Sequence, residues 1–265
     1  EVFHPHAHAA LLAGEYPQVD RWLVFAWDGV GLGVDGTLWG GEALLGTPGH
    51  WQRVASLRPF ALPGGDKASR QPWRSALGLC WEADRVWPAA PGDTHLLHQA
   101  WKQGLNAPCS SAAGRLFDAA AALTGLCCSA SYEGQAPQYL ESAAAELTAT
   151  SVALPLAQDS NGVWRSDWSP LLAMLMNQTE SAAMRAAGFH ASMAQCLLDQ
   201  AVRLREQQGD FVVGLSGGVF QNRRLASEAM TALEQAGFQV HLPEQVPLND
   251  AGLCFGQVIE TMRHD

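Results

Sequence analysis

The chain has 265 residues, of which 48% are hydrophobic, and a formal net charge of −10 at pH 7. Such a length can bury a large core in one or two domains. Only 16 residues are lysine or arginine, spread thinly, so no basic stripe is available for a phosphate backbone and we expect no nucleic-acid partner. No stretch approaches the roughly 18 apolar residues of a membrane span, and no signal peptide is apparent. We therefore expect a cytoplasmic protein without membrane association.

The six cysteines form no C-x-x-C pair and no regular disulfide spacing. This usage favours reduced thiols, and it predicts neither a zinc ribbon nor a disulfide framework. Cys254 lies between Leu253 and Phe255, so we expect it to be a small, buried, hydrophobic side chain.

The first half of the chain begins with a helix and then indicates strands. Residues 22–27 (WLVFAW) form a short apolar run that predicts a buried strand. Residues 28–42 contain six glycines and an Asp-Gly turn between two strand-like arms, which predicts a hairpin. Residues 47–66 indicate further strand and loop, whereas residues 68–130 show helical spacing of apolar residues.

The second half alternates helices and strands. Residues 131–147 predict helix, NGVWRSDW predicts a small β element, and residues 169–208 predict two helices. From residue 210 onward the order strand, glycine turn, helix, strand is the clearest unit of the chain. Together these segments predict an α/β protein that holds a phosphate-bearing ligand between two glycine-rich loops.

Three histidines stand at alternate positions of the first helix. His4 and His8 lie at i and i+4, on one helical face and about 6 Å apart, so both could bind one metal ion. His6 would point roughly 160° away from that face. A histidine pair near the start of a chain is also typical of solvent-exposed side chains, so this spacing alone does not establish a site.

Two aspartates could complete such a site. Asp28 ends the first predicted strand, and Asp250 lies where a loop meets the last predicted helix. Each has a simpler interpretation: Asp28 could begin the glycine turn, and Asp250 could be the N-cap of the helix. From the residues alone we favour these simpler interpretations.

The two glycine-rich segments indicate a ligand close to the main chain. In LSGGVFQN the backbone N–H groups of Gly217 and Gly218 could approach a phosphate or nucleotide. The segment matches neither the P-loop nor G-x-G-x-x-G, and strand–turn–helix units also occur without ligands. The hairpin glycines, among them Gly29 and Gly31, cost backbone entropy, which a ligand at the main chain would explain.

Six segments in order resemble one protein family over nearly the whole chain. They are FHPHAHAALLAGE, FAWDGVGLGVDGTLWGGE, LPGGDKASRQPWRSAL, SSAAGRLFDAAAALTGL, SYEGQAPQYLE and GLSGGVFQNRRL. These resemble the carboxy-terminal region of the HypF family, the carbamoyltransferases of [NiFe]-hydrogenase maturation. The region is also similar to threonylcarbamoyl-transferring enzymes of tRNA modification and to antibiotic O-carbamoyltransferases. The resemblance implies their actin-like, sugar-kinase-like ATP-binding fold.

The resemblance implies a reaction. A carbamoyl group, carried as carbamoyl-adenylate made from carbamoyl phosphate and ATP, passes to the C-terminal cysteine of a HypE-type acceptor protein. The product is a precursor of the hydrogenase cyanide ligands. Two alternatives are a threonylcarbamoyl- or O-carbamoyl-transferring relative and an inactive nucleotide-binding scaffold. The net charge of −10 disfavours a subunit that holds tRNA.

The resemblance also implies roles for individual residues. His4, His8, Asp28 and Asp250 would be the catalytic metal ligands, for one divalent ion that is zinc or iron. Without the resemblance, we would interpret Asp118 as a carboxylate on a helix surface and Gly134 as a turn glycine. The expected nucleotide-binding residues are Gly29, Gly31, Asp118, Gly134, Gly217, Gly218 and Asn222.

The resemblance divides the chain into two parts. Residues 1–22 would be the metal-binding helix and the tail end of a first lobe, and residues 23–265 the second lobe with the nucleotide loops and a C-terminal helix. Family members carry further domains upstream, including the domain that forms the adenylate. We therefore expect this chain to be part of a longer protein, without most of the first lobe.

Overall fold

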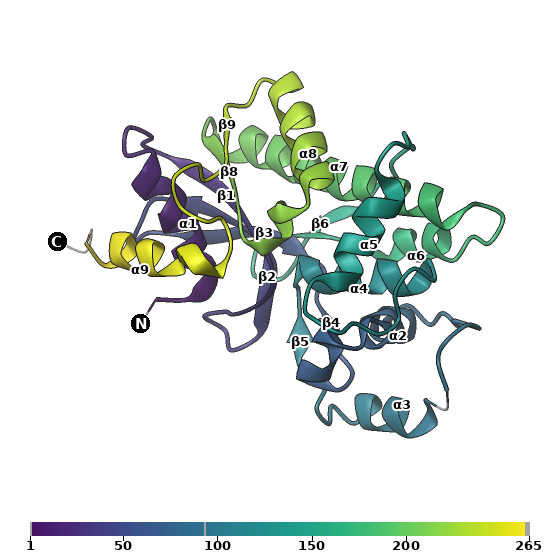
Figure 1. Ribbon diagram of the computed structural model, residues 1–265. Coiled ribbons are helices and arrows are strands. Elements are labelled where there is room, and N and C mark those ends of the chain that lie inside the picture. Colours follow the sequence, from purple (N-terminus) through teal and green to yellow (C-terminus); the bar gives the residue numbers. More distant parts are fainter. Residues whose placement is uncertain (1, 93, 263–265) are drawn as a thin grey trace.

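A mixed β-sheet with helices on both faces forms the framework of the chain (Figure 1). The computed structural model describes residues 2–92 and 94–262. Within these residues, nine strands form one sheet: seven lie in the order β6-β7-β3-β2-β1-β8-β9, and of the two short strands β5 pairs with β2 and β4 pairs with β5. No helix of the described part is long and apolar enough to cross a membrane.

The strands are β1 (Trp22–Leu32), β2 (Leu38–Gly46), β3 (Gln52–Leu57), β4 (Phe60–Ala61), β5 (Cys109–Ser110), β6 (Leu156–Gln158), β7 (Trp164–Ser166), β8 (Val212–Ser216) and β9 (Val240–His241). The α-helices are α1 (His4–Glu15), α2 (Pro72–Glu82), α3 (His95–Lys102), α4 (Ala113–Leu123), α5 (Gln135–Ala144), α6 (Ser169–Leu175), α7 (Ala182–Gln208), α8 (Arg223–Gln235) and α9 (Leu253–Met262). In the part of the chain that the structure describes, three 3₁₀ helices complete the set: η1 (Gly65–Ser69), η2 (Gly218–Gln221) and η3 (Asp250–Gly252).

The predicted elements agree with this order. The hairpin is confirmed as β1 and β2, with the Asp-Gly turn between them, and the small β element predicted at NGVWRSDW is confirmed as β7. Its partner β6 lies just before this segment and was not predicted. The helical block over 68–130 is right for α2, α3 and α4 but missed β5, a two-residue strand held only by pairing with β2 and β4. So short a strand leaves no periodic pattern in the sequence.

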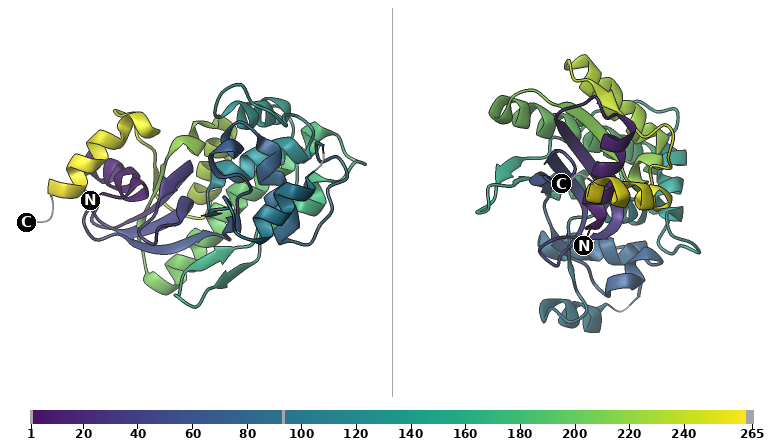
Figure 2. Two further views of the ribbon diagram at one scale, coloured as in Figure 1. Left: turned by 90° about the horizontal axis from the view of Figure 1, so that it is seen from below. Right: turned by 90° about the vertical axis from the view of Figure 1, so that its left-hand side faces the viewer.

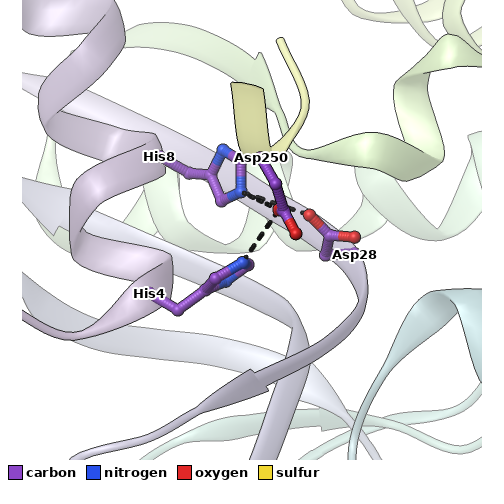
Figure 3. Close-up of side chains that lie close together, drawn as sticks. All are labelled: His4, His8, Asp28 and Asp250. Carbon is purple, nitrogen blue, oxygen red and sulfur yellow. Dashed lines mark hydrogen bonds and ion pairs between the residues drawn. The ribbon is translucent and has the colours of Figure 1, made fainter. Parts of the chain in front are cut away.

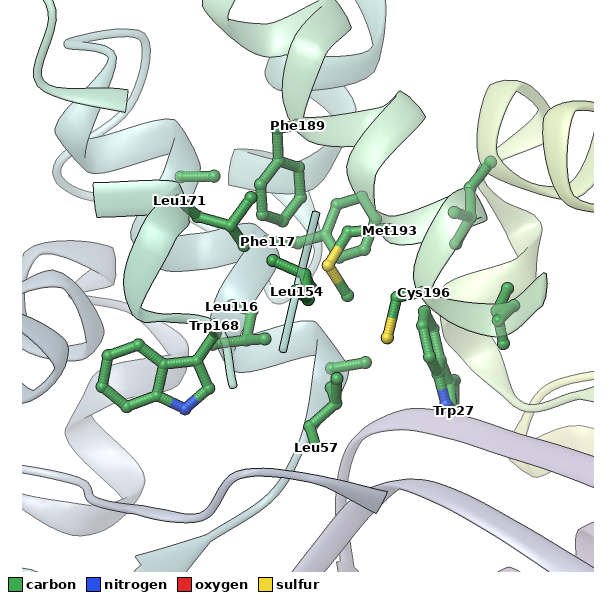
Figure 4. Packing of buried hydrophobic residues seen from close by; sticks show 14 of the residues in the cluster. Trp27, Leu57, Leu116, Phe117, Leu154, Trp168, Leu171, Phe189, Met193 and Cys196 are labelled. Carbon is green, nitrogen blue, oxygen red and sulfur yellow. The ribbon is translucent and has the colours of Figure 1, made fainter. Parts of the chain in front are cut away.

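Strand β1 separates two apolar layers because its side chains alternate between the faces of the sheet. Trp22 and Val24 pack with Leu12 of α1 in a small cluster on one face. Phe25 and Trp27 belong to the large core on the other face, beneath α4 and α7. Figure 4 shows this second layer, in which Trp27, Phe117 and Phe189 lie among aliphatic side chains.

Helices α1 and α9 lie side by side, although they come from opposite ends of the chain (Figures 1 and 2). A Cβ atom on Gly256 would overlap the carbonyl oxygen of Ala7, so only glycine allows this close approach. The expectation that Cys254 is buried is wrong: its side chain is exposed. Only one face of α9 meets α1, and Cys254, two residues before Gly256, lies away from that face.

Candidate metal centre and adjoining cavity

The four predicted ligands come together from three separate segments (Figure 3). His4 and His8 lie one turn apart at the start of α1, where Pro5 fits the first helical turn, and their ring centroids are 4.8 Å apart. Asp28 lies on β1 just beyond the residues that pair with β8, and Asp250 is the first residue of η3. One possible ligand atom from each residue lies within 4.8 Å of all the others.

The ring nitrogens face the carboxylates directly. His4 Nε2 lies 3.0 Å from Asp250 Oδ1, and His8 Nε2 lies 3.1 Å from Asp28 Oδ2 and 3.6 Å from Asp250 Oδ1. The other ring nitrogen of His8, Nδ1, lies 3.3 Å from Ser216 Oγ at the end of β8. This contact fixes the ring orientation and leaves Nε2 turned toward the cluster.

The cluster keeps its two carboxylates ionised. The facing His8 ring lowers the pKa of Asp250 to about 2, against a smaller opposing effect of burial. Burial opposes ionisation of Asp28, but His8 and the backbone N–H groups of Gly218 and Gly29, 3.1 and 2.7 Å from its oxygens, together lower its pKa. Burial likewise opposes protonation of His8, yet the two carboxylates outweigh it and raise its pKa.

The donor set fits a divalent cation. His8 is fully buried, and its Nε2 makes no hydrogen bond of acceptable geometry within the described residues, despite the 3.1 Å approach of Asp28. A buried ring nitrogen without a hydrogen bond, beside two carboxylates, is what a bound ion would satisfy. Two imidazole nitrogens and two carboxylate oxygens suit zinc and ferrous iron equally.

The simpler interpretations of both aspartates are wrong. Asp28 does not begin a turn: it lies within β1, at the irregularity between Trp27 and Gly31, and its Oδ1 accepts the N–H of Gly29. The N-cap interpretation of Asp250 is wrong, because Asn249 is the capping residue: its Oδ1 accepts the N–H of Ala251. Asp250 is thereby free to direct its carboxylate toward the histidines.

His6 lies away from the cluster, as the helical spacing predicts. Its ring lies edge-on to Phe3 and to Trp39, with centroid distances of 6.0 and 6.5 Å. Burial lowers its pKa. His6 is therefore a packing residue of the α1–β2 contact, whereas His4 and His8 share the face that meets the aspartates.

A cavity of about 420 Å³ adjoins the cluster, and Asp28 and Asp250 form part of its wall. Five of the predicted nucleotide-binding residues line it: Gly29, Asp118, Gly134, Gly218 and Asn222. Two do not. A Cβ atom on Gly31 would lie 2.6 Å from His4 Nδ1, and one on Gly217, whose φ is +103°, would overlap the carbonyl oxygen of Trp27. These two glycines therefore allow close packing behind the site.

Asp118 is buried, so its interpretation as a carboxylate on a helix surface is wrong. It is 4% exposed and lies 2.6 Å from Arg115 Nη1, and burial raises its pKa to about 6. Arg115, which the sequence analysis missed, also contacts Glu133 at 2.8 Å and donates to the Gly29 carbonyl at 2.9 Å. The sequence signal that could have revealed Arg115 is its spacing from Asp118, since the two opposite charges lie at i and i+3 in an alanine-rich helix.

His190, also missed, holds Asn222 in the cavity wall. It is fully buried on α7, its Nδ1 donates to the Ala186 carbonyl at 2.8 Å, and its Nε2 accepts from Asn222 Nδ2 at 2.9 Å. Asn222 Oδ1 in turn accepts the N–H of Leu225 and caps α8. A single histidine in the apolar run AAGFHASMA was the signal for a buried polar contact.

His190 gives the folded chain a pH-dependent stability. Burial lowers its pKa from 6.5 to about 4, so between these values the unfolded chain takes up a proton that the folded chain refuses. The contribution of neutral His190 to the free energy of unfolding is therefore complete above pH 6.5 and is lost as the pH falls toward 4. Between pH 7.5 and pH 5, we expect the wild type to lose about 2 kcal/mol more unfolding free energy than His190→Gln. Urea denaturation at both pH values measures this, and equal losses in the two proteins would contradict it.

Comparison with known proteins shows the family to which the chain belongs. The family model described as carbamoyltransferase, Kae1-like domain, second subdomain, matches residues 24–257. Carbamoyltransferase HypF of Rhodobacter capsulatus is 43% identical over 97% of this chain and 35% of its own length. A HypF homolog of Cupriavidus necator is 37% identical over 97% of this chain and 69% of its own. The chain thus spans about a third of the first relative and about two thirds of the second.

Solved structures agree with the sequence matches. A crystal structure of full-length HypF in a phosphate- and nucleotide-bound form matches 98% of this chain and 35% of its own, with a TM-score of 0.89 and 30% identity. The structure of T. kodakarensis HypF matches 97% and 36%, with a TM-score of 0.81 and 28% identity. The predicted actin-like α/β fold is confirmed. The chain belongs to the HypF carbamoyltransferase family, in which it matches the second subdomain of the Kae1-like domain.

Proposed function

We propose that this chain carries the carbamoyl-transfer site of a HypF-type enzyme. Carbamoyl-adenylate, made from carbamoyl phosphate and ATP, would be the donor, and the C-terminal cysteine of a HypE-type protein the acceptor. The observation that carries the proposal is that Asp28 belongs both to the possible metal centre and to the cavity wall. A donor whose nucleotide fills the cavity would thus present its carbamoyl group beside the cluster.

The roles of the residues follow from their positions. His4, His8, Asp28 and Asp250 would hold one zinc or iron ion, which when bound supplies a Lewis acid for oxygens of the donor. Five cavity residues would bind the nucleotide: Gly29, Gly218, Asn222, Asp118 and Gly134. In the transfer, a carbon–sulfur bond forms, the carbon–oxygen bond to the adenylate phosphate breaks, AMP leaves, and the thiol proton passes to solvent.

The cysteines of the chain support an external acceptor. Burial raises the pKa of Cys80 to about 11 and that of Cys196 to about 12, so both remain protonated and poorly nucleophilic at neutral pH. Cys254 is exposed four residues after Asp250. We propose that it is not a carrier of the carbamoyl group, and mass spectrometry after turnover would detect the modification if it were.

The alternative functions have less support. A threonylcarbamoyl-transferring relative would hold tRNA, which the net charge of −10 disfavours. An inactive scaffold would have no use for four converging ligand groups, one of which is a fully buried histidine without a hydrogen bond at Nε2.

We also propose that the chain divides into residues 1–22, the end of a first lobe, and residues 23–265, the second lobe.

Metal binding should distinguish the three histidines of α1. We expect the wild-type chain to bind one equivalent of zinc or iron, and His4→Ala and His8→Ala to bind it far more weakly, because each leaves only three of the four ligands. His6→Ala is the matched control on the same helix and should keep the metal. Titration calorimetry with zinc and metal analysis of the purified proteins measure this. Equal loss in all three variants would contradict the shared helical face.

Nucleotide binding is tested best at Asp118, which lies in the cavity wall but outside the four-residue cluster. A side chain at Gly218 would lie 3.1 Å from Asp28 Oδ1 and would disturb both sites at once. Asp118→Asn should weaken AMP binding roughly 10- to 100-fold, because the charge-assisted hydrogen bond that we propose between the Asp118 carboxylate and the nucleotide is lost. Zinc affinity should stay unchanged. Unchanged AMP affinity in calorimetry would remove Asp118 from the nucleotide site.

A further inference from the structure

The last residue of α1 holds the loop that leads to Asp250. The Glu15 carboxylate accepts three consecutive backbone N–H groups: Glu244 at 2.8 Å, Gln245 at 3.2 Å and Val246 at 2.8 Å. Bonds from backbone N–H groups to a carboxylate are charge-assisted and stronger than bonds between neutral groups. Glu15 therefore anchors a loop segment that lies about 230 residues away in sequence.

The next residue, Tyr16, which caps the C-terminal end of α1, contacts the same loop at its beginning. The Tyr16 hydroxyl donates to the carbonyl of Leu242 at 3.0 Å. At the far end of the loop, the Leu248 carbonyl accepts the N–H of Gly217 at 2.9 Å. The loop over residues 242–249 is thus held at both ends and, through Glu15, in the middle.

Asp250 depends on this loop for its position. Its side chain is 71% exposed, and among the described residues the hydrogen bonds and ion pairs of its carboxylate are with His4 and His8 alone. A bound cation would draw these groups together, but a side chain so exposed gains little from packing that would place it there beforehand. The backbone of the loop must therefore supply that placement.

We infer that Glu15 is a positioning residue that sets Asp250 opposite the two histidines. Helix α1 carries His8 and Glu15 seven residues apart, about 10 Å along the axis, so one rigid element fixes both sides of the site. The inference rests on the proposed metal centre. Partners that orient a metal ligand typically change metal affinity 10- to 100-fold when they are removed.

The test is a double-mutant cycle read by zinc calorimetry on the 265-residue chain. Glu15→Ala should weaken zinc binding about 10- to 100-fold, and Glu15→Gln, which keeps one acceptor oxygen, should weaken it less. In an Asp250→Ala background, Glu15→Ala should change zinc affinity less than about threefold, because the ligand that it positions is already absent.

Asp159→Ala is the matched control. This carboxylate also accepts backbone N–H groups, from Asn161 at 2.8 Å and Val163 at 3.0 Å, but in the β6–β7 turn. It should leave zinc affinity unchanged. A loss of affinity from Glu15→Ala that is as large without Asp250 as with it would overturn the inference, since Glu15 would then act through α1 alone. So would the absence of any loss.

A second measurement separates the inference from the proposed metal centre. If the wild-type chain binds no zinc, the metal centre fails, and hydrogen exchange of the metal-free protein then decides the role of Glu15. Glu15→Ala should speed amide exchange over residues 244–250 at least tenfold while leaving β8 unchanged. Exchange at the wild-type rate in this loop would overturn the anchoring role.

Discussion

The whole site depends on one arrangement: two carboxylates facing a buried histidine. Asp28 and Asp250 are 222 positions apart, yet both approach His8 Nε2 within 3.6 Å. Two such charges held this close repel one another unless a cation or protonated imidazole lies between them. Contacts outside the cluster must therefore offset this repulsion. Helix α1 supplies them, because it packs against the sheet and against α9.

The same arrangement joins the possible metal centre to the cavity. The Asp28 carboxylate accepts the N–H of Gly29 on β1 and the N–H of Gly218 on η2. The strand and the glycine turn are therefore joined at a predicted metal ligand. Arg115 and His190 then fix the wall from behind, the former through Asp118 and the latter through Asn222. The ligand residues and the cavity wall thus adjoin one another and share Asp28.

Much of this could be predicted from local patterns. Helical spacing separated His4 and His8 from His6, and the apolar run with its glycines located the β1–β2 hairpin. Burial was harder to predict, because it depends on which distant element covers a residue. Asp118 is buried because its helix, α4, packs against α2, α5 and β1, contacts that no local pattern reveals. Cys254 is exposed because α9 meets α1 through Gly256. Likewise, Glu15 gave no local signal, since its partners are backbone groups about 230 residues away.

The central claim is that one divalent ion and one nucleotide occupy adjoining positions that share Asp28. The most direct test is diffraction from crystals of the chain grown with zinc and AMP, with data collected at the zinc edge. We expect a single anomalous peak about 2.0–2.2 Å from the ligand atoms of His4, His8, Asp28 and Asp250, with AMP in the cavity between Asp118 and Gly218. An ordered zinc ion bound elsewhere, or AMP bound outside this cavity, would contradict it.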